Sequence, residues 1–545
     1  MRGLMMDVPL TLASLLERAR RYFPQVEVVS RRPDGTISRA KYGAICRRVH
    51  RLADALQQAG LARGDRVATL MWSHAAHLEA YFAIPLSGGI VHPLNPRLHP
   101  SEIAYIARHA GDRFLLVDDV LWPLYERFSN QVSLERVWVH SLGGAPVPAG
   151  IERYESLLSS GAEDFVFSPL DENDAAGMFF TSGTTGRPKG VVYSHRSQVL
   201  HSMALCMADT LAISHSDAVL LVAPMYHVNG WGFPYSCVMA GAKLVLPGAG
   251  CGPEDLLDLI EGEGVTIACA VPTVWFGALE ALRKNPGGWK FRGPVRLLVG
   301  GAAPPASLIR ELDRFGLRIL HAWGMTETSP LATMGRLKVH MQPWNDERKY
   351  EVRSKQGFAA PLIDLRLMRP EGEVPWDGAT PGELEVRGPW VASSYYNAPE
   401  AATRWTDDGW FRTGDVATID PEGYVKLVDR TKDLIKSGGE WISSVDLENA
   451  LMEHPAVREA AVIAVPHPKW QERPLAVVVL REGASADPEQ FRVFLADRFA
   501  EWQIPDGFVF AKEIPRTSVG KFLKSALREQ YRDWSPPAPD MRKKR

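Results

Sequence analysis

The sequence predicts an α/β fold with a large N-terminal domain and a smaller C-terminal α+β domain. Short apolar runs alternate with amphipathic stretches up to about residue 340, which is typical of mostly parallel, doubly wound sheets. Turn-rich, β-rich sequence follows, and then a compact mixed segment. A chain of 545 residues is also long for one core. We therefore expect two doubly wound α/β subdomains and a small β subdomain in the N-terminal domain.

The first α/β subdomain begins with a buried strand over residues 67–72, which a helix over 73–82 follows. A second helix is predicted over 101–109 with Ser101 as its N-cap, because a serine oxygen can accept a free N–H of the first turn. Residues 114–117 again have the apolar character of a strand.

The same rhythm returns in a second α/β subdomain. Pro253 opens a helix predicted over residues 253–261, since proline is favoured in the first helical turn. Four apolar runs around this helix are predicted as strands, over residues 219–222, 243–246, 265–271 and 295–299.

Residues 350–428 contain dense turn signals with short β-rich runs between them, which predicts a small antiparallel subdomain. We place the N-terminal domain at residues 1–428 and the C-terminal domain at 429–545, a length within the usual domain range. In the C-terminal domain we predict one helix and two strands, over residues 445–452, 460–465 and 475–480.

The composition narrows the class of protein. Hydrophobic residues make up 46% and charged residues 23% of the chain, as in ordinary globular proteins. The net charge of −2 gives no indication of a nucleic-acid partner. Five widely spaced cysteines without a Cys-x-x-Cys pair indicate reduced thiols, and the N-terminus lacks the apolar core of a secretory signal. The expected location is cytoplasmic.

One uncharged stretch, residues 218–242, is long enough to cross a bilayer. It contains helix-breaking and polar residues that lipid would not satisfy, namely Pro224, His227, Asn229, Gly230, Gly232 and Pro234. We expect a strand, a loop and a buried helix around an apolar pocket here. No transmembrane segment is predicted, and membrane contact would be at most peripheral.

The stretch from Thr181 to Gly190 is predicted to be a loop that binds a polyphosphate. Its glycines let successive backbone N–H groups point inward as a nest for phosphate oxygens. Hydroxyl groups add donors and a lysine adds charge, but the spacing is not that of a Walker loop. The predicted phosphate-binding residues are Thr181, Ser182, Gly183, Thr184, Thr185, Gly186 and Lys189.

With this loop the chain resembles the adenylate-forming acyl-CoA synthetases. Further motifs match in the same order, at residues 321–327, 413–415, 429–433, 436–441 and 515–521. The resemblance spans nearly the whole chain and is strongest to bacterial medium- and long-chain fatty-acyl-CoA synthetases and 3-methylmercaptopropionate-CoA ligases. It implies an ATP-dependent acid–thiol ligase that forms acyl-CoA through an acyl-adenylate, releases AMP and pyrophosphate, and uses ATP, Mg²⁺ and coenzyme A.

The resemblance assigns the nucleotide site. Glu327 is the implied Mg²⁺ ligand, and Mg²⁺ indeed prefers carboxylate oxygens; Thr326 contacts a phosphate. Asp415 binds the ribose hydroxyls, with Arg430 on the ribose or phosphates. Trp323 replaces the family's usual tyrosine, and either ring can stack on adenine. The remaining implied ATP-binding residues are Gly301, Ala302, Ala303, Gly324 and Met325.

Lys521 is the implied catalytic lysine of adenylation, where its charge bridges the substrate carboxylate and the α-phosphate. It belongs to the C-terminal domain, so the two domains must close on each other. The resemblance implies that the mobile C-terminal domain then rotates about a hinge at Asp429 to admit CoA. The implied CoA-side residues are Lys436, Ser437, Gly438, Gly439, Glu440 and Trp441.

The acyl pocket is implied at residues 225–232, with His227 beside the reacting carboxylate, Val228 in the wall and Trp231 as a tunnel gate; Gly324 also lines it. No acidic residue lies in this segment, which argues against an amino-acid substrate because a buried ammonium group needs a partner. The main prediction is a medium- or long-chain fatty acid. The alternatives are 3-methylmercaptopropionate or another short acid, an aryl acid, and an acyl-AMP ligase that does not use CoA.

A non-catalytic acyl- or nucleotide-binding protein is the alternative from a different functional class. The presence of Lys521, Glu327 and Asp415 argues against it. The expected partners are therefore small molecules, namely a carboxylic acid, ATP and CoA. The resemblance adds a homodimer as a possible assembly.

Overall fold

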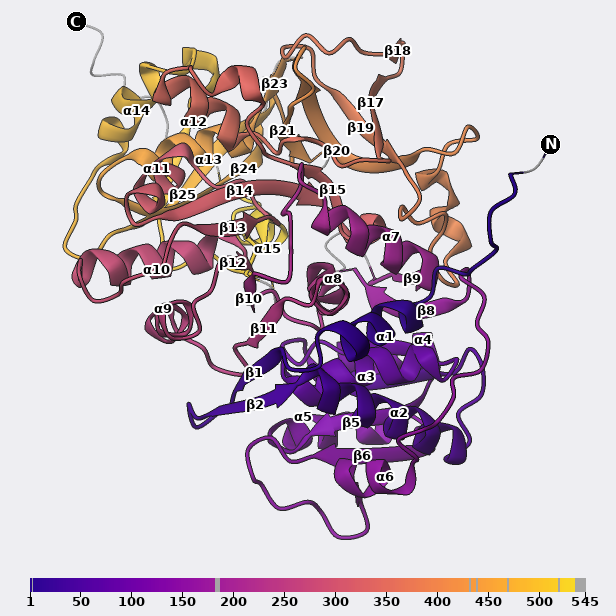
Figure 1. Cartoon of the computed structure of the whole chain (residues 1–545). Coiled ribbons are helices and arrows are strands. Elements are labelled where there is room, and N and C mark those ends of the chain that lie inside the picture. The colour runs from indigo at the N-terminus through magenta and orange to yellow at the C-terminus, as the bar shows by residue number, and fades with distance from the viewer. Residues whose placement is uncertain are drawn as a thin grey trace, which may run out of the picture.

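The computed structural model describes residues 1, 3–181, 187–430, 433–437, 440–467, 470–517 and 520–534 (Figure 1). A seven-stranded sheet in the order β7-β6-β5-β3-β4-β8-β9 lies in the lower part of the view, where β5 and β6 are purple. Its neighbours are parallel except for β8 and β9. The strands are β3 (Arg66–Leu70), β4 (Ile90–Pro93), β5 (Asp112–Asp118), β6 (Arg136–His140), β7 (Glu152–Arg153), β8 (Ala175–Phe180) and β9 (Gly190–Ser194).

A second sheet has nine strands in the order β16-β15-β14-β13-β12-β10-β11-β1-β2. The pairs from β14 to β1 are parallel, and the pairs at both edges are antiparallel. The strands are β1 (Glu27–Arg31), β2 (Ile37–Lys41), β10 (Ala218–Leu221), β11 (Lys243–Leu246), β12 (Ile267–Ala270), β13 (Val295–Val299), β14 (Leu317–Gly324), β15 (Leu331–Met334) and β16 (Phe358–Ala359). The two mostly parallel sheets confirm the predicted fold class.

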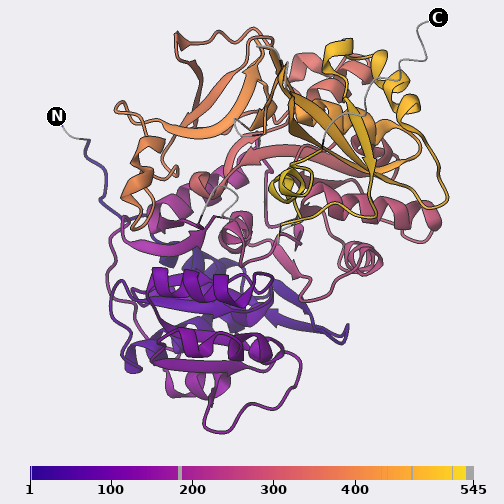
Figure 2. The same ribbon diagram turned by 180° about the vertical axis from the view of Figure 1, so that it is seen from behind.

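Helices surround both sheets (Figures 1 and 2). Those of the first 241 residues are α1 (Leu12–Tyr22), α2 (Tyr42–Gln58), α3 (Ala75–Leu86), α4 (Pro100–Ala110), α5 (Trp122–Glu126), α6 (Tyr154–Ser160), α7 (His195–Cys206) and α8 (Phe233–Ala240). The later ones are α9 (Pro253–Gly262), α10 (Pro272–Lys284), α11 (Ala306–Arg314), α12 (Asp346–Ser354), α13 (Ser444–Glu453), α14 (Pro488–Ala496) and α15 (Lys524–Gln530).

Residues 218–242 form strand β10, a loop with the short helical turn η3 (Val228–Gly232), and helix α8. Six of the eight residues of α8 are buried, and the helix packs on α1 and α7. The expectation of a strand, a loop and a buried helix is therefore confirmed. Within the described residues, no helix combines the length and apolar character that crossing a bilayer requires.

Helix α4 starts one residue earlier than predicted, and Ser101 is not its N-cap. Pro100 occupies the first helical position, and the ring of His99 accepts the N–H of Ser101 at 3.3 Å. Because proline has a fixed φ suited to the first turn, it moves the start of the helix and leaves the capping to His99. Helix α9, in contrast, begins at Pro253 as expected.

The turn-rich segment folds into a five-stranded antiparallel sheet, as predicted. Its strands are β17 (Asp364–Arg369), β18 (Gly372–Glu373), β19 (Gly382–Arg387), β20 (Phe411–Ile419) and β21 (Val425–Arg430). A further five-stranded sheet carries α13, α14 and α15. Its strands are β22 (Ile435–Ser437), β23 (Glu440–Ile442), β24 (Val457–His467), β25 (Gln471–Leu480) and β26 (Gly507–Phe510).

This C-terminal part lies against α10 and α11 of the large N-terminal part, as both views show in yellow (Figures 1 and 2). A cavity of about 290 Å³ lies between them. Arg283 and Glu311 line it from one side, and Arg458, Arg481 and Phe522 from the other. A Cβ placed on Gly520 would lie 3.4 Å from Thr273 Oγ1 on α10. The residue that precedes Lys521 is therefore next to the start of α10.

Candidate active site

The two ends of the predicted phosphate loop are pinned to each other between β8 and β9. The N–H of Thr181 donates to the carbonyl of Lys189 at 2.9 Å, and the N–H of Lys189 donates to Thr181 Oγ1 at 3.1 Å. The ammonium of Lys189 lies 5.8 Å from the centre of the Tyr395 ring. The middle of the loop, namely Ser182, Gly183, Thr184, Thr185 and Gly186, lies outside the described residues.

Glu327 lies in the short turn η4 (Thr326–Thr328) and is buried. Its Oε1 accepts the hydroxyl proton of Tyr395, while Tyr193 donates its hydroxyl to the carbonyl of Thr326. Burial, and next the charge of Glu327, raises the pKa of Tyr395, so the phenol stays protonated and can donate. One oxygen of the carboxylate is thus oriented by a phenol. A buried carboxylate held in this way fits Mg²⁺, which takes hard oxygen ligands.

Sequence analysis missed Tyr395 and Tyr193. Tyr395 lies between two strands in a loop without periodicity, and its only signal was the pair Tyr395-Tyr396 in a polar stretch. Buried tyrosine hydroxyls usually need a polar partner, so the two residues become informative only when the fold shows which partner they have.

Trp323, Asp415 and Arg430 meet where β14 faces β20 and β21. The indole N–H of Trp323 donates to Asp415 Oδ2 at 2.9 Å, and Arg430 Nε lies 3.4 Å from Asp415 Oδ1. Asp415 and Arg430 are also direct partners in the β20–β21 ladder. The tryptophan in place of tyrosine therefore holds the carboxylate that the resemblance assigns to the ribose.

Lys521 lies across the turn that follows β13. A Cβ added to Gly301, which has φ +83°, would be 2.9 Å from Lys521 Cε and 3.6 Å from its Nζ, so a side chain at 301 would collide with the lysine. Burial, and next the charge of Arg430, lowers the pKa of Lys521 to about 8, although Asp415 and Glu327 act in the opposite direction. The structure thus brings Lys521 to the residues predicted for the nucleotide.

His227 is close enough to Lys521 to sense its charge. Burial, and then this charge, lowers the pKa of His227 to about 3. The imidazole is therefore neutral near pH 7 and offers one N–H donor without a charge.

The segment after His227 has an unusual backbone. Val228, Asn229, Gly230, Trp231 and Gly232 all have positive φ, between 45° and 79°. Bulky and β-branched residues rarely adopt this region, and such strain gathers at functional sites. The ring of Trp231 lies 3.6 Å from the position that a Cβ on Gly300 would take. The predicted gate residue therefore lies beside the turn that Lys521 crosses.

Gly324 and Met325 connect β14 to the turn that carries Glu327. A Cβ on Gly324 would lie 1.7 Å from the carbonyl oxygen of Pro330, and the N–H of Met325 donates to that oxygen at 3.1 Å. Ala302 and Ala303 belong to the turn after β13 that also contains Gly301. Apart from 182–186, every residue predicted for ATP thus lies in this region, on β8, β13–β14, η4 and β20–β21 or in the loops that follow or precede them.

The predicted CoA-side residues lie elsewhere. Lys436 and Ser437 belong to β22, and Glu440 and Trp441 to β23. The Ser437 hydroxyl accepts from Arg473 Nη1 at 3.1 Å, and the N–H of Lys436 donates to Glu472 at 2.8 Å. Gly438 and Gly439 lie outside the described residues. Within the residues that the structure describes, no hydrogen bond or ion pair joins Lys436 or Ser437 to the site of Lys521, Glu327 and Asp415.

Asp429, the predicted hinge, is buried at the end of β21. Its Oδ2 accepts the backbone N–H of Ser444 at 2.9 Å and also the hydroxyl of that residue, and its Oδ1 accepts the N–H of Arg430 at 2.8 Å. Burial raises the pKa of Asp429 in spite of the nearby Lys524. The carboxylate thus fixes the start of α13 to the end of the large part of the chain.

The profile of the AMP-binding enzyme family matches residues 16–396, and that of the AMP-binding enzyme C-terminal domain matches residues 446–521. The chain belongs to the AMP-binding enzyme family. The resemblance expected from the motifs is confirmed.

Several proteins are similar to this AMP-binding enzyme over nearly their whole length. The long-chain-fatty-acid–CoA ligase of Thermus thermophilus is 49% identical over 533 residues, 97% of each chain. The medium-chain-fatty-acid–CoA ligase of Ectopseudomonas oleovorans is 43% identical, covering 98% of each chain. The 3-methylmercaptopropionyl-CoA ligase of Ruegeria lacuscaerulensis is also 43% identical, covering 98% of this chain and 99% of its own.

Solved structures agree with this placement. The anthranilate CoA ligase AuaEII in complex with anthranoyl-AMP has a TM-score of 0.86 at 25% identity, over 96% of this chain and 98% of that one. ATP-bound MatB from Rhodopseudomonas palustris has a TM-score of 0.81 at 28% identity, over 96% and 99%.

Proposed function

We propose that this AMP-binding enzyme joins a medium- or long-chain fatty acid to coenzyme A. It is an AMP-forming acyl-CoA synthetase, with ATP, Mg²⁺ and CoA as cosubstrates and cofactor. The observation that carries the proposal is the position of Lys521 against Gly301, among the charges of Glu327, Asp415 and Arg430. The names of relatives at 43–49% identity support the choice of acid.

In the first half-reaction the acid carboxylate attacks the α-phosphorus of ATP, and pyrophosphate leaves. Lys521 places its charge beside the carboxylate and the α-phosphate, in a site where such a contact stabilises the transition state more than in water. Asp415 holds the ribose hydroxyls, aided by Trp323 and Arg430. Glu327, oriented by Tyr395, would hold Mg²⁺, which neutralises phosphate charge when bound.

In the second half-reaction the CoA thiol attacks the acyl carbon and AMP leaves. We propose that the domain of residues 429–545 then turns about Asp429 relative to residues 1–428. Lys521 would leave the site, and the hairpin β22–β23 with Lys436 to Trp441 would replace it. The separate placement of this hairpin and of Lys521 in the structure supports the need for such a movement.

We propose a cytoplasmic location and a homodimer. The first is supported by five cysteines that are all free thiols in the structure, as expected for a reducing compartment. The homodimer rests on the resemblance alone, and sedimentation velocity on the purified chain tests it.

The acid is identified by AMP release with ATP, Mg²⁺ and CoA across propionate, 3-methylmercaptopropionate, octanoate, palmitate and benzoate. We expect the highest kcat/KM with octanoate or palmitate. A maximum at 3-methylmercaptopropionate would replace the fatty acid with the short thioether acid, as the similarity to the Ruegeria enzyme allows. Formation of acyl-AMP without any CoA-dependent product would identify an acyl-AMP ligase.

In the same assay, Trp231→Ala should shift the preferred acid and leave the KM for ATP unchanged. An unaltered acid profile would contradict the role of Trp231 as a gate.

The rate of adenylation should fall as the pH rises through about 8. The pKa of Lys521 is lowered to about 8, so its charge is present below that pH and is lost above it. At one pH unit above the pKa, roughly a tenth of the lysine is charged, which predicts an about tenfold slower first half-reaction. His227, with a pKa of about 3, does not titrate in this range. Single-turnover pyrophosphate release between pH 6 and 10 measures the effect. Lys521→Arg is the control, since a guanidinium keeps its charge, and a variant profile with the same alkaline limb would assign the limb to another group.

A further inference from the structure

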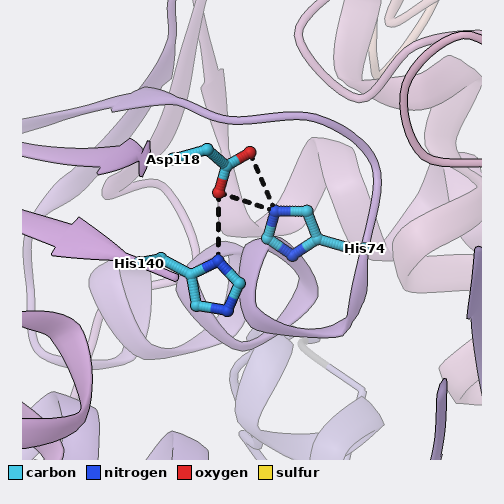
Figure 3. Close-up of side chains that lie close together, drawn as sticks. All are labelled: His74, Asp118 and His140. Carbon is cyan, nitrogen blue, oxygen red and sulfur yellow. Dashed lines mark hydrogen bonds and ion pairs between the residues drawn. The ribbon is translucent and has the colours of Figure 1, made fainter. Parts of the chain in front are cut away.

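Three titratable side chains outside the proposed catalytic site converge at the carboxyl ends of adjacent strands in the seven-stranded sheet (Figure 3). Asp118 is the last residue of β5 and His140 the last of β6, and His74 is the N-cap of α3 after β3. These strands are adjacent and parallel in the order β6-β5-β3. The carboxyl ends of parallel strands are where doubly wound sheets bind ligands.

The ligand-type atoms of the three residues already lie together. Asp118 Oδ1 is 2.9 Å from His74 Nε2 and 3.1 Å from His140 Nδ1. The two imidazoles are nearly parallel, with centroids 4.7 Å apart and an interplanar angle of 16°, and both turn a nitrogen toward the same carboxylate (Figure 3). Bonds of about 2.0–2.2 Å to a tetrahedral ion separate its ligand atoms by roughly 3.3–3.6 Å. The two distances from Asp118 Oδ1 must therefore lengthen by up to about 0.7 Å to admit an ion, and the three ligand atoms already lie within 4.8 Å of one another.

The carboxylate is held for such a role by its second oxygen. The backbone N–H of Trp72 donates to Asp118 Oδ2 at 2.8 Å, and Asp118 has no exposed surface. Carboxylates that ligate a metal are usually hydrogen-bonded in turn, as Asp118 is here by the backbone of Trp72.

The set of donors selects the kind of ion. Two imidazole nitrogens and one carboxylate oxygen suit zinc and neighbouring divalent transition metals, whereas Mg²⁺ and Ca²⁺ prefer oxygen ligands only. His140 keeps 16% of its side-chain surface exposed, which leaves an approach for the ion and for a water as fourth ligand. Metal binding at His74 breaks one existing hydrogen bond. The Nδ1 of His74 accepts the backbone N–H of His77, and a metal at Nε2 requires the ring proton to be on Nδ1. The contact is long, at 3.4 Å.

We propose that His74 Nε2, Asp118 Oδ1 and His140 Nδ1 bind one divalent transition metal of the zinc class. The ion ties the ends of three strands together. It also neighbours the acyl segment, because the Trp72 ring meets Tyr226 edge-on at 5.8 Å and Ser73 Oγ accepts the N–H of Met225 at 3.2 Å. The expected role is stabilisation of the wall behind that segment, separate from the Mg²⁺ that accompanies ATP.

The test uses full-length protein without a histidine tag, stripped by a chelator and titrated with Co²⁺ in the absence of ATP. We expect one equivalent to bind, with the d–d absorption of a nitrogen and oxygen site and without thiolate charge-transfer bands. Zn²⁺ should displace the cobalt and raise the melting temperature. His140→Gln should weaken Co²⁺ binding at least tenfold, because an amide can still donate to Asp118 but is a poor metal ligand.

The matched control is His50→Gln, which removes another partly buried imidazole, one that hydrogen-bonds the Phe165 carbonyl at 2.7 Å. It should leave Co²⁺ binding unchanged. Absence of stoichiometric binding, equal affinity in His140→Gln, or thiolate charge-transfer bands would overturn the proposal. If His140→Gln does not fold, the imidazole NMR signals of the wild type decide: cobalt-shifted signals from two histidines support the site, and none overturns it.

Discussion

Lys521→Ala should slow formation of the acyl-adenylate by about 10²–10³-fold, the usual effect of removing one preorganised contact to a developing charge. The lysine is placed by its contact with Gly301 and by the surrounding Glu327, Asp415 and Arg430. Alanine leaves the site without a cation beside the carboxylate and the α-phosphate. Since Lys521 would be absent from the site during thiol attack, transfer of a supplied acyl-AMP to CoA should remain within a fewfold of wild type.

Two assays separate the half-reactions of this variant. Single-turnover pyrophosphate release measures adenylation, and acyl-CoA formation from synthetic acyl-AMP measures transfer. Lys524→Ala is a poor control, because Lys524 is paired with Glu448 and holds α15 to α13. Lys512→Ala is a suitable control, because Lys512 is an exposed lysine in the same C-terminal segment of the chain as Lys521. Equal losses in both half-reactions of Lys521→Ala would contradict the assigned role.

Local patterns of the sequence were sufficient to predict the kinds of sheet in the fold. Strand and helix alternation predicted two parallel sheets, and turn signals predicted the antiparallel one. The sequence could not predict which distant strands pair. Strand β1 pairs with β11, for example Val28 with Leu244, so the N-terminal hairpin β1–β2 joins the nine-stranded sheet. Nothing local distinguishes a strand that pairs with its neighbour from one that pairs some 200 residues away.

The finer geometry of the site depended on contacts that no sequence pattern contains. The motifs predicted roles for Glu327, Asp415 and Trp323. The hydrogen bonds from Tyr395 to Glu327 and from Trp323 to Asp415 become visible only in the fold. The run of positive φ from Val228 to Gly232 was equally hidden, since only Asn229-Gly230 is a usual signal for such a turn. Hydrogen bonds to neighbouring helices stabilise this segment. Tyr81 on α3 donates to the Met225 carbonyl, and Asn229 donates to Gln198 on α7 at 2.6 Å.

Gly324→Ala should reduce kcat/KM by about 10²-fold or more. The new Cβ would lie 1.7 Å from the carbonyl oxygen of Pro330 and 2.7 Å from its carbonyl carbon, and neither is a flexible side-chain end that could give way. The turn from Met325 to Pro330 must therefore shift, and it carries Glu327 and Thr326 with it. A displacement of about 1 Å at a positioning group is enough to cost roughly 10²-fold in rate.

The control for this variant is Gly262→Ala, at the end of α9, where an added Cβ meets nothing within 4 Å. It should keep full activity and melt at or above the wild-type temperature, because alanine favours the helix. Steady-state kinetics with saturating ATP and thermal melting are measured for both variants. A Gly324→Ala enzyme with activity within threefold of wild type would show that the turn adapts without moving Glu327, and the carboxylate would then not depend on this close packing for its position. A low melting temperature with a normal rate per folded molecule would give the glycine a role in stability alone.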